Sequence, residues 1–284
     1  MIGSSRFVTY QQLPQGYSRT LGSPPHQPVT PRPAATLALL RGRGGTVEVL
    51  LLKRSPATRF IPGAFVFPGG RVDVEDGSRE MESFLSEPSP LEANALLGED
   101  PDLPPAHAFW VAALRETFEE AGILLGGGEE GVRSFPLEEG KGIGGLRRDL
   151  HSGNRSFPSI LGALDRGLNG GSLRYIGHWM TPIQERYRYD TRFFGAEVPP
   201  DCQVFPDGTE MVEALWLTPE EALHRNRSGV LPMVFPTILT LEELLPFRSP
   251  REALEELGRR PIQRLLPMVE DTGTGVKMVL TPVP

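Results

Sequence analysis

Two stretches decide the fold of this 284-residue chain, FPGG at residues 67–70 and LRETFEEAGI at residues 114–123. Apolar residues recur at helical spacing through the second stretch and just before it, at Trp110, Val111, Leu114, Phe118 and Ala121. The sequence therefore predicts a helix with an apolar stripe facing a core. Glu116, Glu119 and Glu120 fall at positions i, i+3 and i+4, so their carboxylates share one face of that helix.

Carboxylates gathered on one helix face repel one another, and a bound cation would neutralise them. Carboxylate oxygens are hard ligands, which favours Mg²⁺ or Mn²⁺ over softer metals. Glutamates on a helix more often form a solvated face, and a Gly-Gly pair is more often a plain turn. Here the two occur together, and the glycine backbone can approach a ligand closely. Gly122 supplies the permissive backbone at which the helix ends.

The two stretches together resemble the signature of the Nudix hydrolases, which cleave diphosphates linked to a second moiety with the help of a divalent metal. The family pattern is Gly-x5-Glu-x7-Arg-Glu-U-x-Glu-Glu-x-Gly-U, in which U is a bulky apolar residue. Gly70 opens the pattern here, and residues 115–123 close it. The chain departs from it in three places. Asp76 replaces the first glutamate, residues 77–114 replace the seven-residue spacer, and Thr117 is a weak U residue.

An overlapping stretch resembles the coenzyme A diphosphatase branch of that family. Its signature is Leu-Leu-Thr-x-Arg-Ser/Ala-x3-Arg-x3-Gly-x3-Phe-Pro-Gly-Gly, and residues 50–70 match it except that Leu52 replaces Thr. The long spacer and the sequence RYDTRFF at residues 188–194 resemble the peroxisomal-type members of the branch. The resemblance implies cleavage of coenzyme A or an acyl-coenzyme A to 3′,5′-ADP and (acyl-)4′-phosphopantetheine.

The resemblance also implies roles for individual residues. Glu116 and Glu120 are expected to be the principal metal ligands, and Glu119 a further ligand. Arg115 is expected to orient the acidic cluster by ion pairing, with Asp76 in the same network. In Nudix enzymes a glutamate outside the signature often serves as a base or extra ligand, and two candidates remain open here. The catalytic set is therefore Arg115, Glu119 and Glu120, together with Glu210 or Glu213.

Phosphate contacts are expected around the Gly-Gly turn. The backbone of Gly69 and Gly70 is expected to shape the metal and phosphate pocket. Arg54 and Arg59 precede the turn and are predicted to bind substrate phosphates. The alternative for these two arginines is a surface salt bridge with the acidic residues that follow the turn.

Three arginines further along the chain, Arg186, Arg188 and Arg192, are spaced by even numbers of residues. If a strand begins early in this segment, the alternation puts all three on the same side of it. Guanidinium groups so placed can bind phosphates bidentately. The alternative is a solvated edge paired with acidic neighbours such as Asp190. We expect Arg188 and Arg192 to bind substrate because they lie in the resembling segment.

The order of predicted elements fits an α+β fold, namely the α/β/α sandwich of the Nudix fold, with a mixed central sheet and helical insertions. We expect strands near residues 34–40, 46–53, 64–67, 123–125, 173–180, 189–198, 210–217 and 276–280. Further helices are expected near residues 218–226, 236–245 and 250–257. We divide the chain into a partly flexible N-terminal arm (1–33) and a single domain (34–284). The insertions lie at about 77–104 and 129–172, and each is expected to form helices.

Composition limits the classes of partner. The formal net charge of −7 argues against bulk nucleic-acid binding. Cys202 is the only cysteine, so an intrachain disulfide is excluded. No apolar run is long enough to cross a bilayer, and neither an apolar signal-peptide core nor a C-terminal Ser-Lys-Leu address is present. We therefore expect a cytoplasmic protein with a small-molecule substrate and no membrane partner. The first insertion is compatible with a lid or a homodimer surface.

Two alternatives to a coenzyme A diphosphatase stay open at this stage. The first is a Nudix hydrolase of another nucleoside diphosphate derivative, such as ADP-ribose or a dinucleotide. The second is a Nudix-like module that binds a nucleotide as a sensor without catalysis. The intact set of Glu116, Glu119 and Glu120 argues against the sensor, because binding alone does not need a full metal cluster.

Overall fold

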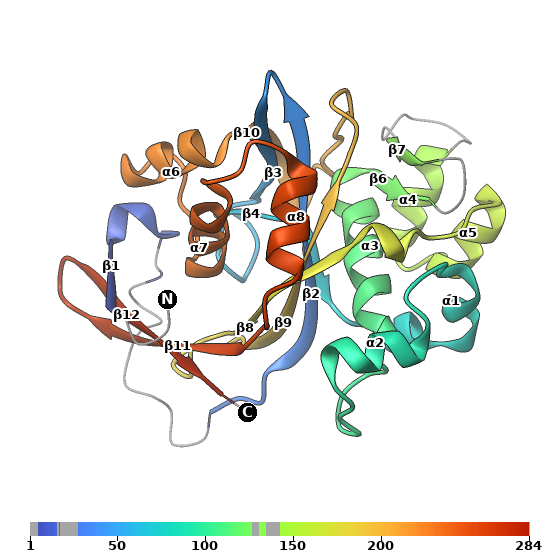
Figure 1. Ribbon diagram of the computed structural model, residues 1–284, viewed down its shortest axis with the longest axis horizontal. Helices are drawn as coiled ribbons and strands as arrows, with labels where there is room; N and C mark the ends of the chain where they lie inside the picture. Colours follow the sequence, from blue (N-terminus) through green and yellow to red (C-terminus); the bar gives the residue numbers. More distant parts are fainter. Residues whose placement is uncertain (1–4, 16, 18–27, 127–130, 135–142, 284) are drawn as a thin grey trace.

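A mixed sheet between two helical layers forms the body of the protein (Figure 1). The computed structural model describes all residues except 1–4, 16, 18–27, 127–130, 135–142 and 284. Helices α6 (Pro219–Arg227), α7 (Phe235–Leu244) and α8 (Pro250–Gly258) cover one face of the sheet. The other face carries α1 (Arg79–Phe84), α2 (Pro90–Leu97), α3 (His107–Ala121), α4 (Ile143–His151) and α5 (Phe157–Leu164). The predicted α/β/α sandwich is confirmed.

The sheet has ten strands within the described residues. They are β1 (Ser5–Thr9), β2 (Arg32–Arg43), β3 (Thr46–Arg54), β4 (Phe65–Val66), β5 (Gly69–Arg71), β8 (Arg174–Met180), β9 (Tyr189–Glu197), β10 (Met211–Leu217), β11 (Arg264–Asp271) and β12 (Gly275–Pro282). The main order is β1-β12-β11-β8-β9-β2-β3-β10, with β4 paired to β3 and β5 paired to β2. A separate pair joins β6 (Ile123–Leu125) to β7 (Val132–Ser134).

Strand β2 organises the part of the sheet that carries the site. It pairs in parallel with β9, where Arg32 lies opposite Tyr189 and Thr36 opposite Phe193. It also pairs antiparallel with β5, where Ala34 lies opposite Arg71. These registers bring the Gly-Gly stretch and the segment around residue 190 to the same stretch of β2.

Helix α3 packs its apolar residues into the core as the sequence predicts. Trp110, Leu114 and Phe118 are all buried, and the Trp110 ring lies 4.7 Å from the ring of Phe194 on β9. The helix ends at Gly122, whose φ of 69° is a left-handed conformation that costs a glycine little. The packing of these apolar residues fixes the position of the acidic face of the helix relative to the sheet.

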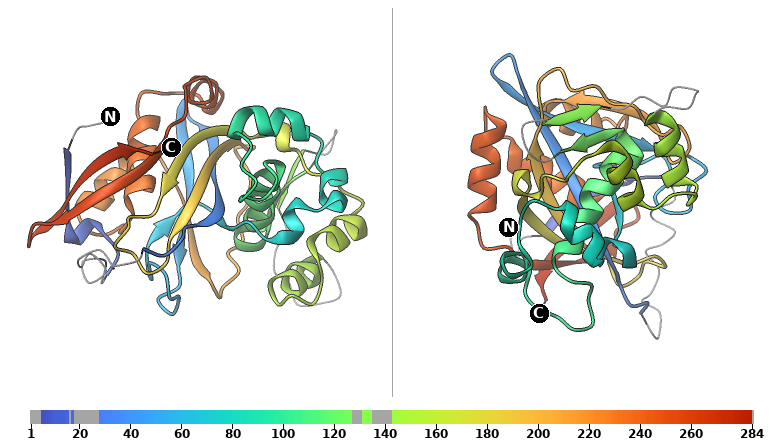
Figure 2. Two further views of the ribbon diagram at one scale, coloured as in Figure 1. Left: turned by 90° about the horizontal axis from the view of Figure 1, so that it is seen from below. Right: turned by 90° about the vertical axis from the view of Figure 1, so that its right-hand side faces the viewer.

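The two insertions form helices, as predicted, and they contact each other. The backbone N–H of Leu168 donates to the carbonyl of Phe84 at 2.7 Å, and the N–H of Ser86 donates back to the Leu168 carbonyl at 2.9 Å. Together the insertions extend the helical layer on the side of α3 (Figure 2). Strand β7 was not predicted within the second insertion, because its three residues are too short to show a periodic pattern.

The described part of the N-terminal arm packs on the domain. Strand β1 pairs antiparallel with β12 at the sheet edge, and Val8, Leu13 and Tyr17 are buried. Arg6 forms an ion pair with Glu242 on α7. The arm therefore adds a strand and core residues to the domain. Residues 18–27 of the predicted arm lie outside the described residues.

The β11–β12 ribbon extends the C-terminal end of the sheet beyond the single strand predicted near residues 276–280. Strand β11 was missed because Pro267 and several exposed residues interrupt its alternation. Among the helices that the structure describes, none has the length and apolar character needed to cross a membrane.

Candidate active site

A cavity of about 1230 Å³ is lined by the acidic residues of α3 and by one face of strands β2 and β9. Alternate residues of two strands line it: Arg32, Ala34 and Thr36 from β2, and Tyr189, Thr191 and Phe193 from β9. Since successive side chains of a strand point to opposite faces, this period of two marks one face of the sheet. The Gly-Gly corner, the loop at residues 54–61 and α3 line further sides.

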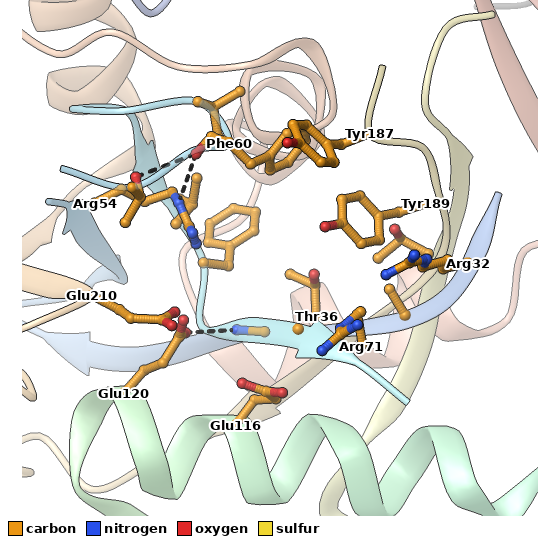
Figure 3. A pocket seen from close by; sticks show the side chains of 18 of the residues that line it. Arg32, Thr36, Arg54, Phe60, Arg71, Glu116, Glu120, Tyr187, Tyr189 and Glu210 are labelled. Carbon is orange, nitrogen blue, oxygen red and sulfur yellow. Dashed lines mark hydrogen bonds between the residues drawn. The ribbon is translucent and has the colours of Figure 1, made fainter. Parts of the chain in front are cut away.

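The predicted acidic trio lies at one wall of the cavity. Glu116 and Glu120 rise from α3 into it (Figure 3), and Glu119 also lines it. Glu120 is 4% exposed and accepts a hydrogen bond of 2.9 Å from the backbone N–H of Gly69. The helix and the Gly-Gly corner are therefore joined directly at one of the two predicted principal metal ligands.

Arg115 ties the two halves of the signature together. Its Nε and Nη2 donate to the two carboxylate oxygens of Asp76, each at 2.8 Å. Its Nη1 donates to Glu116 and to Glu119, each at 2.9 Å. The fork geometry of a guanidinium suits such bidentate contact. Arg115 thus orients the acidic cluster as predicted, and Asp76 belongs to the same network.

Close contacts explain why both residues of the corner are glycines. A Cβ on Gly69 would lie 2.5 Å from the Ala35 carbonyl oxygen and 2.7 Å from the Cα of Thr36. A Cβ on Gly70 would lie 2.4 Å from the carboxyl carbon of Glu116. All three distances are well inside van der Waals contact. Gly69 lets β5 approach β2, and Gly70 leaves room for a carboxylate of the acidic cluster.

Burial makes the acidic cluster unfavourable in its charged form. Burial is the largest effect on all three carboxylates and raises the pKa of Glu116 to about 7, against the opposing attraction of Arg115. The pKa of Glu120 is raised well above its usual range by burial and by the neighbouring Glu116. Burial also raises the pKa of Glu119. A positive charge brought to this wall would be stabilised by these groups.

Within the described residues, no group of three or more His, Cys, Asp or Glu side chains is already arranged to hold a metal ion. The donor set nevertheless fits a hard divalent cation. Glu116, Glu119 and Glu120 offer carboxylate oxygens only, on a wall of one cavity, and Arg115 is hydrogen-bonded to only two of them. Desolvated carboxylate oxygens of this kind suit a hard divalent cation.

The second insertion and the loop before β10 support the end of the carboxylate helix. Buried Arg147 on α4 donates from Nε to the Glu119 carbonyl at 2.8 Å. The N–H groups of Phe205 and Asp207 donate to the carbonyls of Ala121 and Glu120 at 2.9 and 3.2 Å. Carbonyls at a helix C-terminus lack partners inside the helix, so these contacts satisfy them. They also hold the last turn of α3 in place.

The structure separates the two glutamates between which the sequence could not choose. Glu210 lines the cavity and lies beside Glu120 (Figure 3). Glu213 is not among the residues lining it, and its carboxylate pairs with Lys53 at 3.3 Å on the neighbouring strand. The position of Glu213 does not fit the catalytic role predicted for it, whereas that of Glu210 does.

Arg54 and Arg59 both line the cavity. Arg54 is half-buried, and its Nε donates to the Phe60 carbonyl at 3.2 Å, which orients the guanidinium at the wall near Glu120 and Glu210 (Figure 3). Arg59 is exposed at the rim. Both positions are compatible with the predicted contact to substrate phosphates.

Arg188 and Arg192 do not line the cavity, which corrects their prediction as substrate-binding residues. Strand β9 starts only at Tyr189, and Tyr189, Thr191 and Phe193 occupy its cavity face. The even-numbered residues consequently point to the opposite face. The condition for a face shared by all three arginines is not met, since Arg186 and Arg188 precede the strand, and Arg192 lies on the face away from the cavity.

Both buried arginines have structural partners instead. Arg188 donates to the backbone carbonyls of Val29 and Thr181 at 2.8 and 3.2 Å. Arg192 pairs with Asp190 at 2.9 Å, and its guanidinium carbon lies 4.3 Å from the centre of the Phe109 ring. These contacts link β9 to the loops before it and to α3.

The cavity also contains residues that we did not predict as site residues. Arg32, Arg71, Tyr187 and Tyr189 line one side of it (Figure 3), and His151 and Arg155 come from the second insertion. The alternation of Arg32 with Ala34 and Thr36 was a signal of a shared face. Nothing in the sequence indicated that this face shares a cavity with the carboxylates of α3, because strand order is not encoded locally.

Comparison with known proteins agrees with this geometry. The family model of the NUDT19 Nudix domain matches residues 30–244. The chain belongs to the NUDT19 Nudix family. This match covers the Gly-Gly corner, the carboxylate helix and both insertions, and the Nudix diphosphatases are accordingly its enzyme class.

Individual relatives support the same family. The acyl-coenzyme A diphosphatase NUDT19 of Homo sapiens is 30% identical over 82% of this chain and 70% of its own length. The protein of the same name from Gallus gallus is 31% identical over 71% of this chain, which spans 62% of that relative. A Nudix hydrolase structure from Alicyclobacillus acidocaldarius aligns with a TM-score of 0.67 at 33% identity. It covers 82% of this chain and 99% of its own. The predicted Nudix fold is thereby confirmed.

Proposed function

We propose that this member of the NUDT19 Nudix family hydrolyses the diphosphate of coenzyme A or an acyl-coenzyme A. The products would be 3′,5′-ADP and 4′-phosphopantetheine or its acyl form. The observation that carries the proposal is the placement of Glu116, Glu119 and Glu120 beside the Gly-Gly corner in one large cavity. The names of the NUDT19 relatives support coenzyme A derivatives as the substrate class.

The residues of the chain have distinct parts in this reaction. Arg115 holds Glu116 and Glu119 in fixed orientations, and the Gly69 N–H does the same for Glu120. Arg54 supplies positive charge at the wall that faces Glu120, where it can hold a phosphoryl oxygen. Glu210 lies within the cavity as the candidate to accept a proton from the attacking water.

Mg²⁺ or Mn²⁺ is the proposed cofactor, held by Glu116, Glu119 and Glu120. When bound, a divalent ion at this wall supplies charge neutralisation for the diphosphate oxygens and orientation for water. The carboxylate-only donor set supports a hard cation rather than zinc or copper.

Product identification tests this proposal. Purified protein is incubated with coenzyme A, acetyl-coenzyme A, ADP-ribose, NADH and a dinucleoside polyphosphate in Mg²⁺ or Mn²⁺, and the products are identified by mass spectrometry. We expect 3′,5′-ADP from the coenzyme A compounds. Glu120→Gln is the matched control, because its amide oxygen can still accept the Gly69 hydrogen bond while the negative charge is lost. This variant should fold as the parent does and lack turnover.

The outcomes distinguish the alternatives. Cleavage of ADP-ribose or a dinucleotide without cleavage of coenzyme A would refute the proposed substrate, and the proposed hydrolase activity would stand. Tight binding of a nucleotide without turnover of any compound would favour a sensor. Equal turnover by Glu120→Gln and the parent would refute the role of the acidic cluster.

Three further expectations are proposals about the setting of the enzyme. We propose a cytoplasmic location, because the single cysteine, Cys202, suits a reducing compartment. We propose that its substrate is a small molecule, with no nucleic-acid or membrane partner. A homodimer formed through the first insertion is the third, and light scattering of the purified protein tests it.

A further inference from the structure

Two arginines on the side of the cavity away from Arg54 have no counter-ion within the described residues. Arg32 and Arg71 are exposed and face the cavity (Figure 3). In the part of the chain that the structure describes, neither side chain forms an ion pair or a hydrogen bond. Only their backbones are engaged: the Arg32 N–H donates to the Arg188 carbonyl, and the Arg71 carbonyl accepts from Arg115.

Strand register brings these two arginines together. Arg71 lies opposite Ala34 in the antiparallel β2–β5 pair, two residues along β2 from Arg32. Residues i and i+2 share a strand face, so Arg32 and the partner of Arg71 point to the same side. Figure 3 shows the two guanidinium groups near each other, above Glu116 and below Tyr189. Two adjacent guanidinium groups form a site for one strongly anionic group.

An aromatic cluster borders the arginines. Tyr189 lies directly opposite Arg32 in the β2–β9 pair. The Phe60 ring lies 5.1 Å from the Tyr189 ring and 6.5 Å from the Tyr187 ring, in edge-on arrangements. Tyr187 is 37% exposed, so part of its ring is available to a ligand. Aromatic rings beside a nucleotide-binding surface offer a platform on which a base stacks.

The acidic residues on this side of the cavity do not neutralise the positive charge of the two arginines. Asp73 and Glu75 also line the cavity, and both are exposed. The carboxylate of Asp73 is directed to Arg115, 3.6 Å from its Nη2. The diphosphate of the substrate is already assigned to the acidic wall and Arg54. Arg32 and Arg71 therefore require a second anionic group on the same ligand.

We propose that Arg32 and Arg71 bind a ribose 3′-phosphate, and that Tyr187 and Tyr189 hold the adenine next to it. This inference rests on the proposed function, because coenzyme A carries a single further anionic group beyond its diphosphate. That group is a phosphomonoester attached to the ribose that bears the base. The cluster of four residues thereby selects 3′-phosphoadenosine derivatives over ADP-ribose, NADH and dinucleotides, which lack this phosphate.

A binding experiment tests the inference without turnover. Isothermal titration calorimetry in Mg²⁺ compares 3′,5′-ADP with 5′-AMP, which differ only in the 3′-phosphate. We expect the parent to bind 3′,5′-ADP about 10- to 100-fold more tightly, as charge-assisted hydrogen bonds to a phosphate allow. The Arg32→Gln/Arg71→Gln variant should bind the two nucleotides with similar affinity. Arg43→Gln, on the exposed β2–β3 hairpin outside the cavity, is the matched control and should keep the parent's preference.

The contribution of the tyrosines to nucleotide binding can be measured separately from that of the two arginines. Tyr187→Ala should weaken 5′-AMP and 3′,5′-ADP by the same factor, about tenfold, because it removes stacking and leaves the arginines. A selective loss of 3′,5′-ADP binding in Tyr187→Ala would contradict the division of roles. Equal affinity of the parent for 3′,5′-ADP and 5′-AMP would overturn the inference.

Hydrolysis then distinguishes this inference from the proposed function. The parent should cleave coenzyme A with a higher kcat/KM than 3′-dephospho-coenzyme A, and the double variant should lose that preference. Cleavage of both compounds at equal kcat/KM would remove the 3′-phosphate site and leave the diphosphatase standing. Absence of any cleavage, with selective binding of 3′,5′-ADP retained, would remove the diphosphatase and leave the 3′-phosphate site standing.

Discussion

Asp76 and Arg115 are joined by two hydrogen bonds of 2.8 Å although they lie 39 residues apart in the chain. Both side chains are buried, at 2% and 6% exposure. The first insertion, with α1 and α2, occupies the intervening sequence. The pair therefore reconnects the two halves of the Nudix signature across the insertion, and it fixes the arginine that orients Glu116 and Glu119.

Replacing Asp76 by Asn tests this connection. The amide cannot accept both guanidinium bonds, so Arg115 loses its anchor and the acidic cluster loses its orientation. We expect kcat/KM to fall about 10- to 100-fold, as for other partners that orient a metal-binding residue. The free energy of unfolding should fall by about 3 kcal/mol, because a buried arginine is left without its main counter-ion. Steady-state kinetics and urea denaturation measure the two effects.

Asp73→Asn is the control for this change. Its carboxylate lies 3.6 Å from Arg115, but its side chain is 59% exposed. The control variant should stay close to the parent in both measurements. If Asp76→Asn behaved in the same way as Asp73→Asn, the insertion-spanning pair would have no role in the site.

The two outer glutamates should respond differently to the same change. Glu210→Gln removes a carboxylate that lines the cavity beside Glu120, and kcat should fall about 100-fold or more if it accepts the proton of the attacking water. Glu213→Gln alters a residue paired with Lys53 outside the cavity, and it should keep nearly the parental kcat. Initial-rate kinetics under saturating substrate decide between them. A large loss in Glu213→Gln with an active Glu210→Gln would reverse the assignment.

Replacement of the two corner glycines by alanine should have different effects on activity and stability. In Gly70→Ala the new methyl group meets the flexible end of Glu116, so the carboxylate must move. We expect activity to fall about 10- to 100-fold, because catalytic geometry is lost, while the melting temperature changes little. In Gly69→Ala the methyl group meets backbone atoms of Ala35 and Thr36. Stability should then fall by about 1–3 kcal/mol.

Differential scanning fluorimetry and steady-state kinetics of the two alanine variants measure this contrast. Gly45→Ala would not be a suitable control, because Gly45 has a positive φ of 77°. A Cβ on Gly42 would lie 3.6 Å from the nearest side-chain atom of Pro250, which is ordinary van der Waals contact. Gly42→Ala is therefore the reference for an added methyl group. Equal stability loss in all three variants would contradict the steric account of the corner.

The interactions of Asp190 predict that the folded state loses stability in acid. Burial alone would raise its pKa, but the hydrogen bond with His178 and the charges of Arg192 and Arg264 lower the pKa to about 2. A carboxylate with a lowered pKa stabilises the folded state above the pKa of the unfolded chain, near 4, and this contribution is lost as pH falls toward 2. The shift corresponds to about 2 kcal/mol.

Asp190→Asn checks this contribution by denaturation at several pH values. At pH 7 the variant should be less stable than the parent, because Arg192 and Arg264 lose a buried partner. The difference between variant and parent should shrink as pH falls below about 4. Asp201→Asn, at an exposed position, should show no such pH-dependent difference. A constant difference between pH 5 and pH 2.5 would contradict the lowered pKa.

The sequence by itself determined the local elements and the chemistry of the acidic cluster. Helical spacing placed Glu116, Glu119 and Glu120 on one face, and the apolar stripe of Trp110, Leu114 and Phe118 determined which face is buried. These are properties of neighbouring residues, since a helix repeats every few positions along the chain. The same locality allowed the glycine corner and the helical character of both insertions to be predicted.

Only the tertiary structure decided which side chains meet across the sheet. The sequence put Arg188 and Arg192 on one face of a strand, but the tertiary packing determined that α3 covers the face of Arg192 and that the cavity lies on the other face. It likewise distinguished Glu210 from Glu213, and it brought Arg32 on β2 to Tyr189 on β9. The physical reason is that strand alternation fixes relative sides, whereas the identity of the buried side depends on contacts between residues far apart in the chain.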